Sequence, residues 1–402
     1  MKIIPKIKTI LFIATILLSA CSKEEDNDQF STLGAPKDKQ NIIQAGISLA
    51  SETNGLAQTD FANLCLNLAG YMQVDVSNHQ NLVHSIAEIG TKMVDKTFIQ
   101  TQFEELLTLT TNSCNDIGVI WNEGYGIWEW DLKLNDFIQT SADGEDITFL
   151  FPSDSNHTDN NVTLRLYDFT SYNGNFSGKG DVLEDGTILN EILKSLYLDI
   201  KVEDKLIASS NIIMDFSDSG NIENINLTFN PIPYSFQIEM SAFNGNASWR
   251  YTLLNDINLV FEQYIAGIYE GDFENKPVIN DIYSSTQIGD IKIIAEVNSA
   301  DLLNDISVIE TKKLASKELA NQTANVVNDN SILSIRYANN TIIANGNAVA
   351  RLLEEETGEW IVDIAFQFSD ESTEYITDLI KYTYLFEDNL DLILKKTENR
   401  LQ

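Results

Sequence analysis

The chain has 402 residues, of which 43% are hydrophobic, and its 26 Lys and Arg against 60 Asp and Glu give a formal net charge of −34. A chain of this length and apolar content can bury enough surface to fold, which excludes a wholly disordered or collagen-like protein. The strong negative charge repels phosphate backbones, so nucleic acid is not an expected partner.

The first twenty residues have the pattern of a secretory signal. A start with three lysines is followed by the apolar run 10–18, which is too short to span a bilayer. The run ends at Leu18-Ser19-Ala20-Cys21, which resembles the lipobox of bacterial lipoproteins. This resemblance implies cleavage before Cys21, acylation of Cys21 and anchoring in a membrane by its acyl chains. The alternative is an ordinary secretory signal in which the cysteine is incidental.

Residues 21–37 are predicted to form an acidic flexible tether, because this polar stretch cannot bury apolar surface. Cys21 followed by acidic residues resembles the surface-export signal of lipoproteins from Bacteroidota, although Lys23 departs from its all-acidic form. The resemblance implies an outer-membrane lipoprotein displayed at the cell surface. A position facing the periplasm is the alternative.

Residues 38–118 are predicted to be helical, because apolar residues recur at steps of three and four. Thr59-Asp60 is a typical helix start. Glycines at 55, 70 and 90 separate four apolar stripes, which we interpret as core. The first stripe is Ile42, Ile43, Ile47 and Ala50, the second is Phe61, Leu64, Cys65 and Leu68, and the others lie within 82–93 and 98–109.

Residues 119–290 are predicted to be rich in antiparallel strands, because the apolar period changes to two from Gly126 onward. Polar tips with turn residues separate the strands, which predicts a meander whose dry face is covered by a second sheet or by helices. The expected strands lie within 128–134, 147–151, 162–166, 196–202, 206–210, 225–229, 234–240 and 249–253.

Residues 291–402 are predicted to mix strands and helices. Strands are expected within 291–297, 332–337, 342–352 and 360–368, with one helix over 300–328. A closing helix is expected to begin at Ser372-Thr373-Glu374 and to end near Lys395-Lys396. No clear boundary lies near Asp290, so residues 119–402 can be one sheet with helices against it. The predicted fold class is therefore α+β, with a helical region, a mainly antiparallel β-sheet body, covering helices and a C-terminal helix.

Residues 121–254 resemble uncharacterised lipoproteins of Bacteroidota. The resemblance is carried by Gly-Ile-Trp-Glu-Trp-Asp at 126–131, Phe-Leu-Phe-Pro-Ser at 149–153 and Leu-Ile-Ala-Ser-Ser at 206–210. It implies no activity, because that family brings none with it.

The candidate chemical groups point to no enzyme, metal or cofactor. His79 and His84 are five residues apart rather than the four of a helical zinc pair, and no Gly-x-Ser-x-Gly elbow is present. Acidic residues are so common that Glu129 with Asp131, or 354–356, are better explained as solvated faces and turns than as a glycosidase pair. His157 and the oxygen-rich runs 154–161 and 215–221 are interpreted as surface turns rather than calcium loops. The glycine-rich run 173–180 lacks the spacing of a phosphate-binding loop.

Two cysteines remain after acylation of Cys21, and both lie in the helical region. In an exported chain Cys65 and Cys114 can form a disulfide, whereas Cys65 on an apolar helix face can equally be a buried thiol. Trp128 and Trp130 are expected to share one strand face with Leu132 and Leu134, which favours core packing over a sugar platform.

These observations predict a non-catalytic binding or scaffold protein of the cell envelope, held at the membrane by an N-terminal lipid anchor. The ligand, whether protein, lipid or glycan, is not encoded in any motif. One alternative is a carrier of a lipid or other apolar ligand in a half-barrel-like sheet, with a cavity lined by Phe149, Leu198, Phe236 and Ile238. A second alternative is a glycan-binding accessory protein, which requires exposed tryptophans beside a carboxylate pair.

Overall fold

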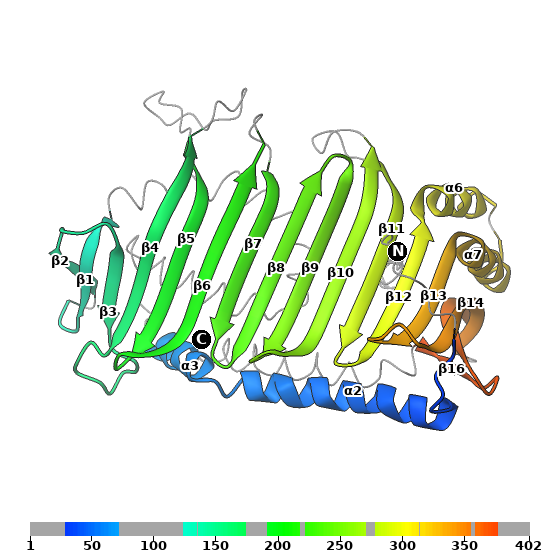
Figure 1. The fold of residues 1–402 in the computed structure, drawn as a ribbon, viewed down its shortest axis with the longest axis horizontal. Helices are drawn as coiled ribbons and strands as arrows, with labels where there is room; N and C mark the ends of the chain where they lie inside the picture. The colour runs from blue at the N-terminus through cyan, green and yellow to red at the C-terminus, as the bar shows by residue number, and fades with distance from the viewer. Residues whose placement is uncertain are drawn as a thin grey trace. The chain divides into compact units, whose positions relative to one another are not determined.

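The computed structural model describes residues 29–71, 124–134, 136–173, 191–217, 222–270, 278–312, 314–354 and 358–376. Within these ranges the protein is an α+β structure dominated by one large, mostly antiparallel sheet with few helices, so the predicted class is confirmed at this level (Figure 1). The signal sequence, the start of the tether, the helical stripes at 82–93 and 98–109 and the closing helix beyond residue 376 lie outside the described residues.

The described elements are four helices and sixteen strands. The helices are α2 (Ala35–Leu56), α3 (Asp60–Tyr71), α6 (Ser299–Glu310) and α7 (Ser316–Asn330). The strands are β1 (Gly126–Asp131), β2 (Asp136–Ser141), β3 (Ile147–Phe151), β4 (Val162–Asn173), β5 (Glu191–Val202), β6 (Lys205–Phe216), β7 (Ile222–Pro231), β8 (Tyr234–Phe243), β9 (Asn246–Asn255), β10 (Asn258–Glu270), β11 (Val278–Ile288), β12 (Ile291–Asn298), β13 (Ser331–Tyr337), β14 (Ile342–Glu354), β15 (Glu359–Phe368) and β16 (Thr373–Tyr375).

The strand order in the sheet follows the chain from β3 to β16, with β1 next to β3 and β2 at the end. Successive strands therefore form a meander, in which each strand returns beside the one before it. The exception is β1, which pairs antiparallel with β2 and parallel with β3. The hairpin of β11 and β12 crosses Asp290, so the strands on both sides of that residue belong to the same sheet.

The chain forms two compact units, one of residues 1–51 and 239–385 and the other of residues 52–238 and 386–402. We refer to them as the first unit and the second unit. The divisions fall inside α2 and β8.

In the second unit, side chains that alternate along paired strands form a buried apolar face. Phe149 lies opposite Leu164, and Leu164 lies opposite Ile200, and all three are buried. The polar tip predicted between β5 and β6 is a tight turn, in which Glu203 and Asp204 have φ values of 49° and 67°. A two-residue hairpin with both φ values positive is the turn that matches the twist of antiparallel strands.

The strand predicted over residues 128–134 ends earlier than expected. The carboxylate of Asp131 accepts hydrogen bonds from the backbone amides of Lys133 and Leu134, at 2.7 and 3.1 Å, and so turns the chain after β1. Leu132 and Leu134 are therefore exposed in this turn and do not share the core face of Trp130. The predicted position of the two leucines is wrong, because local turn formation competes with the strand.

The first two of the four predicted helical stripes lie in helices of the described residues, α2 and α3. Thr59 begins α3 as predicted, since its hydroxyl accepts a hydrogen bond from the amide of Ala62 at 3.1 Å. In α2 the buried residues follow a stripe through Ala35, Asp38, Leu49, Thr53 and Leu56. Ile47, predicted as core, is exposed because it points away from this stripe.

The single helix predicted over residues 300–328 is two helices, α6 and α7. The side chain of Asn298 begins α6 by accepting a hydrogen bond from the amide of Asp301. The chain then folds back near Lys312, so that α6 packs on β11 and β12 while α7 packs on β13, β14 and β15. An unbroken helix of this length would extend about 43 Å in one direction and could not make both sets of contacts.

The closing helix does not begin at Ser372 as predicted. Residues Thr373–Tyr375 form β16, which pairs antiparallel with β15. The turn before it is closed by Asp370, which binds both the amide and the hydroxyl of Ser372, and by Glu371, whose φ is 66°. The polar residues that suggested a helix start therefore form a hairpin turn.

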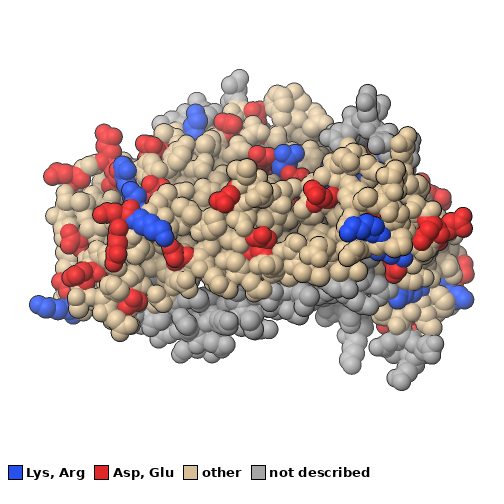
Figure 2. Space-filling model, turned by 60° about the horizontal axis from the view of Figure 1, so that its bottom comes forward, with Lys and Arg blue, Asp and Glu red and all other residues tan. Residues whose placement is uncertain are grey.

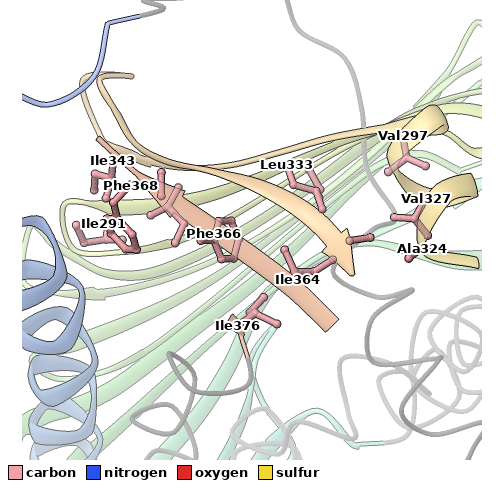
Figure 3. Packing of buried hydrophobic residues seen from close by; sticks show 14 of the residues in the cluster. Ile291, Val297, Ala324, Val327, Leu333, Ile343, Ile364, Phe366, Phe368 and Ile376 are labelled. Atoms are coloured by element: carbon pink, nitrogen blue, oxygen red, sulfur yellow. The ribbon is translucent and has the colours of Figure 1, made fainter. Parts of the chain in front are cut away.

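The core of the first unit lies between the sheet and helices α6 and α7 (Figure 3). Gly346 marks its tightest point, because it lies opposite Phe366 on β15 and Leu333 on β13. A Cβ atom at Gly346 would come within 2.8 Å of both side chains, so only glycine lets the Phe366 ring lie across the strand. The labelled residues in Figure 3 are Ile291, Val297, Ala324, Val327, Leu333, Ile343, Ile364, Phe366, Phe368 and Ile376.

Candidate functional site

Cys21, the strongest functional candidate from the sequence, lies outside the described residues. The structure does describe the point at which the chain that follows Cys21 enters the fold. We call the set Gln29, Ser31, Asp38, Tyr337 and Ile342 the N-terminal junction.

Backbone hydrogen bonds attach the N-terminal segment to the first strand residue of β14. The amide of Ser31 donates to the carbonyl of Ile342 at 2.7 Å, and the amide of Ile342 donates to the carbonyl of Gln29 at 3.1 Å. Phe30 and Ile342 thus form a parallel bridge. The tether expected over residues 21–37 therefore does not extend through residue 37, because the chain is hydrogen-bonded to the sheet at residue 29 and helical from Ala35.

A buried carboxylate holds the same segment by its side chains. Asp38 is fully buried in the first turn of α2, and its Oδ1 accepts hydrogen bonds from the hydroxyls of Ser31 and Tyr337, at 2.9 and 2.7 Å. Asn41 donates to the Tyr337 hydroxyl at 2.8 Å. The Oδ2 atom of Asp38 has no hydrogen-bond partner within the described ranges. A carboxylate at a helix N-terminus is favoured by the helix dipole, which offsets part of its burial cost.

Two ion pairs join elements of the first unit that lie beside the junction. Arg351 on β14 binds the buried carboxylate of Asp363 on β15 at 2.8 Å, and its guanidinium lies 4.1 Å from the ring centre of Tyr375 on β16. Lys39 on α2 binds Glu374 on β16 at 2.8 Å. These contacts connect α2 and the last three described strands beside the junction.

Cys65 is a buried, free thiol in α3. Burial raises the pKa of this thiol to about 12, so at neutral pH it is protonated and poorly nucleophilic. Its proposed disulfide partner, Cys114, lies outside the described residues.

The Cys65 thiol is expected to resist alkylation in the folded protein, because it is both buried and protonated. Iodoacetamide labelling at pH 8, followed by peptide mass spectrometry, should modify Cys65 in urea but leave it largely unmodified under native conditions. Peptide analysis separates Cys65 from Cys114. Equal rates of Cys65 labelling in the two conditions would contradict its described burial.

Two acidic candidates from the sequence serve local structure. Glu129 accepts a hydrogen bond from the hydroxyl of Thr140 at 3.0 Å. The backbone amides of Leu134 and Lys133 lower the pKa of Asp131, which closes the turn after β1. Of the second acidic run, Glu355 and Glu356 lie outside the described residues.

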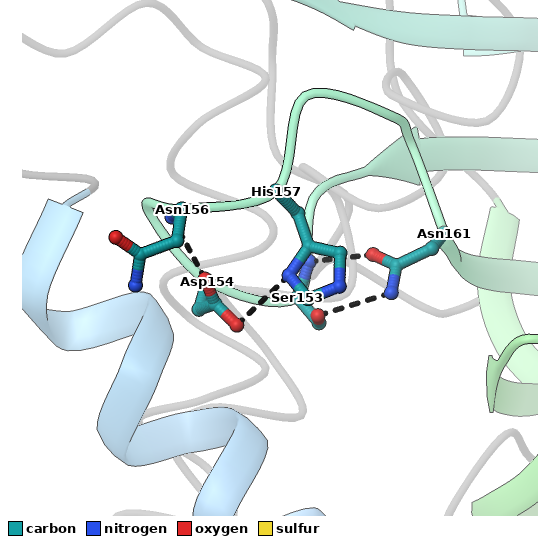
Figure 4. Close-up of polar contacts among 5 residues, drawn as sticks. All are labelled: Ser153, Asp154, Asn156, His157 and Asn161. Carbon is teal, nitrogen blue, oxygen red and sulfur yellow. Dashed lines mark hydrogen bonds and ion pairs between the residues drawn. The ribbon is translucent and has the colours of Figure 1, made fainter.

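The oxygen-rich loop between β3 and β4 is a hydrogen-bonded turn, as predicted (Figure 4). The Asp154 carboxylate accepts from the amide of Asn156 at 2.7 Å and contacts Nδ1 of His157 at 2.9 Å. The amide of Asn156 and then His157 lower the pKa of Asp154. The side chain of Asn161 bonds both the amide and the hydroxyl of Ser153. These oxygens therefore stabilise the loop, and His157 lies at the surface.

The tryptophans divide between core and partly covered positions. Trp130 is 4% exposed and meets the Phe137 ring edge-to-face at 5.1 Å, which confirms its predicted core packing. Trp128 is half-buried, and its indole Nε1 donates to the carbonyl of Gly124 at 2.9 Å. Trp249 and Trp360 are also half-buried, while Trp121, His79 and His84 lie outside the described residues.

Two tyrosines with raised pKa values make the fold sensitive to high pH. Burial, together with the Glu52 and Asp38 carboxylates, raises the pKa of Tyr234 and of Tyr337 to about 12. Tyrosine in an unfolded chain ionises near pH 10. Because the folded pKa values lie above the unfolded one, the stability linked to these groups is fully present below about pH 10 and is lost as the pH rises to about 12.

Urea unfolding at pH 8 and at pH 11, followed by circular dichroism, is expected to show this loss of stability. The variant with Tyr234→Phe and Tyr337→Phe lacks both hydroxyls and should lose less stability between the two pH values. Equal losses in the variant and the natural chain would show that these tyrosines do not carry the effect.

The described ranges contain no cluster of metal-binding side chains and no helix that could cross a membrane. No three His, Cys, Asp or Glu side chains in the described part of the chain are grouped so that they could hold a metal ion. No helix there has both the length and the apolar content needed to cross a membrane. Comparisons of the chain with protein-family models, with curated protein sequences and with solved structures found no match.

Proposed function

We propose that this protein is an outer-membrane lipoprotein, acylated at Cys21, that acts as a non-catalytic binding or scaffold protein at the cell envelope. The observation that carries the proposal is the sequence Leu18-Ser19-Ala20-Cys21 after a short apolar run, followed at once by an acidic polar stretch. Two or three acyl chains on one cysteine bury enough methylene groups for stable anchoring, at about 0.8 kcal/mol each.

We also propose that helices cover the apolar face of the sheet. These are the rest of the helical region 38–118 and a closing helix beyond residue 376. The support is physical: an antiparallel sheet with one apolar face must cover it. In the second unit that face carries buried residues such as Phe149, Leu164 and Phe236, and α3 contacts β6 and β7.

A non-catalytic role is supported by what the candidate groups do in the described residues. Glu129, Asp131 and Asp154 bind backbone or hydroxyl groups of their own turns and hairpins. The buried Cys65 thiol is unsuited to nucleophilic attack, because its thiolate is disfavoured.

The residues that would line the cavity of a lipid carrier are instead packed against other side chains, which favours a filled core. Phe137 meets Phe149 edge-to-face at 5.1 Å, and Phe229 stacks on Phe236 at 6.2 Å. Phe61 of α3 in turn covers Phe229 at 4.9 Å. Protein side chains thus occupy the space beside these rings. The buried Trp130 counts against the glycan-binding alternative.

Native mass spectrometry of residues 22–402, the mature chain without its anchor, tests the scaffold against the carrier. The scaffold proposal predicts the mass of the chain alone and no lipid in an organic extract of the purified protein. A bound lipid at a fixed ratio would contradict it and favour the carrier. In that case Phe149→Trp, which narrows the supposed cavity, should lower the bound fraction, while the exposed substitution Phe243→Trp should leave it unchanged.

A further inference from the structure

The distance between the anchor and the fold is short. This inference rests on the proposed acylation of Cys21, while the structure fixes the chain to the sheet at Gln29. The two residues are eight positions apart (29 − 21 = 8). Eight residues span at most about 26–29 Å even when fully extended. The edge of the first unit that holds Gln29 therefore stays within that distance of the bilayer surface.

This edge is the row of strand ends and turns on one side of the sheet, and the order of the meander identifies it. Gln29 pairs with Ile342, the first residue of β14, so the N-terminal segment enters at the edge that holds the β13–β14 turn. Turns alternate between the two edges of a meander, so the β9–β10 and β11–β12 turns lie at this same edge. Figure 1 shows α2 running along it. We call it the anchor edge.

The first unit cannot turn over so that the opposite edge lies against the membrane, because Gln29 would then be farther from the bilayer than the tether reaches. A strand of ten residues, such as β9, is about 33 Å long, which exceeds the reach of the tether. The β8–β9 turn lies at that far edge.

Both edges of the first unit expose large apolar side chains: at the opposite edge Phe243 and Ile332 are 53% and 64% exposed, and the anchor edge carries exposed ones of its own. Ile257, in the β9–β10 turn, is 91% exposed, and Leu33, before α2, is 56% exposed. Phe30 and Ile47 on the same elements are 38% and 45% exposed. Large apolar side chains exposed at a turn tip gain free energy when they enter the interfacial region of a bilayer.

Charge does not drive this contact. Among residues 35–51 of α2 the charged residues are Lys37, Lys39 and the buried Asp38, so this stretch exposes only basic groups. The neighbouring turns carry the exposed acids Asp256 and Asp290. Figure 2 turns this side toward the viewer and shows acidic side chains spread over it, with basic ones among them. Because these lysines and acids offset one another, the contact is expected on neutral lipid and needs no anionic lipid.

We propose that the anchor edge of the first unit rests on the lipid headgroup region, with Ile257, Leu33 and Phe30 in contact with the bilayer. The short tether keeps this edge, and not the opposite one, beside the bilayer, where its exposed apolar side chains enter the headgroup region. The opposite edge, with the β8–β9 turn, then faces away from the membrane and is free for a partner.

A pair of fluorescent probes tests this orientation. Ile257→Cys and Phe243→Cys are made in a full-length chain that carries Cys65→Ala and Cys114→Ala, and each is labelled with a thiol-reactive fluorophore. Both are exposed apolar residues close to the two ends of β9: Ile257 lies in the turn after β9, and Phe243 is the last residue of β8, just before the turn to β9. The acylated protein is placed in phosphatidylcholine vesicles that contain a lipid with a nitroxide on its headgroup.

The probe at residue 257 should lose about twofold or more fluorescence relative to the probe at residue 243, which lies about 33 Å away along the strand. Equal quenching, or stronger quenching at residue 243, would overturn the proposed orientation. The mass of the N-terminal peptide is measured in the same sample. An unmodified Cys21 would refute the anchor itself, whereas an acylated Cys21 with no difference between the probes refutes only the orientation.

Discussion

Replacing Cys21 with Ala is expected to move the protein from the membrane fraction to the soluble fraction. The proposed anchor is the acyl group on this one sulfur atom, and the chain without it has a strongly negative charge that favours no attachment to anionic lipid. Fractionation of cells that express the natural chain and the variant, followed by immunoblotting, measures the change. We expect nearly complete loss from the membrane pellet.

Cys114→Ala is the matched control, because it makes the same chemical change at a cysteine that is not part of the lipobox resemblance. It should leave the protein in the membrane pellet. A Cys21→Ala protein that stays in the pellet after washing at high salt would contradict acylation as the basis of attachment.

Phe366→Ala is expected to cause the largest loss of stability among single substitutions in the first unit. Phe366 is 1% exposed and lies in the core of the first unit, opposite Gly346. Removing a buried phenyl ring typically costs about 3–5 kcal/mol, because the neighbours fill the cavity only in part. Urea unfolding measured by circular dichroism should show this decrease, while Phe243→Ala, at an exposed position, should change stability by about 0.5 kcal/mol or less.

Gly346→Ala tests the same contact from the other strand. Its new methyl group would lie 2.8 Å from the Phe366 ring, so the substitution should cost about 1–3 kcal/mol. In the double variant with Phe366→Ala the methyl group enters the space left by the ring. The double variant should therefore be more stable than the sum of the two single losses predicts. Additive losses would contradict the described packing.

Strands with uninterrupted alternation could be predicted from the sequence. β3 and β8 begin where they are expected, because buried side chains alternate from the first residue of each strand. The start of α3 was equally clear, since Thr59 caps the helix by a bond within three residues. These are local signals, so the amino-acid pattern contains them.

Strands with bulges or small polar residues on the buried face could not be predicted. β10 has register shifts near Leu259 and Gly267, which reverse the side-chain alternation within one strand. In β11 the buried face includes Ser284, whose polar character hides the pattern. Whether a side chain such as Ile47 is buried depends on what packs against its helix, which the helical period alone does not specify.

The candidate site also has one part that the sequence reveals and one part that it does not. The lipobox resemblance is visible because four adjacent residues carry it. The N-terminal junction is not visible, because Asp38 meets Tyr337 across 299 positions of sequence and nothing local marks either residue as a partner. Asp38 could be recognised as an acidic residue of a first helical turn, but not as a buried carboxylate.

The mass of the N-terminal peptide of the protein, purified from the membranes of a bacterial host, tests the central claim most directly. If Cys21 is acylated as proposed, the first residue is Cys21, and its mass is raised by a diacylglycerol group on sulfur, with or without a third acyl chain on the new amino group. A peptide that begins before Cys21, or that begins at Cys21 without added mass, would contradict it.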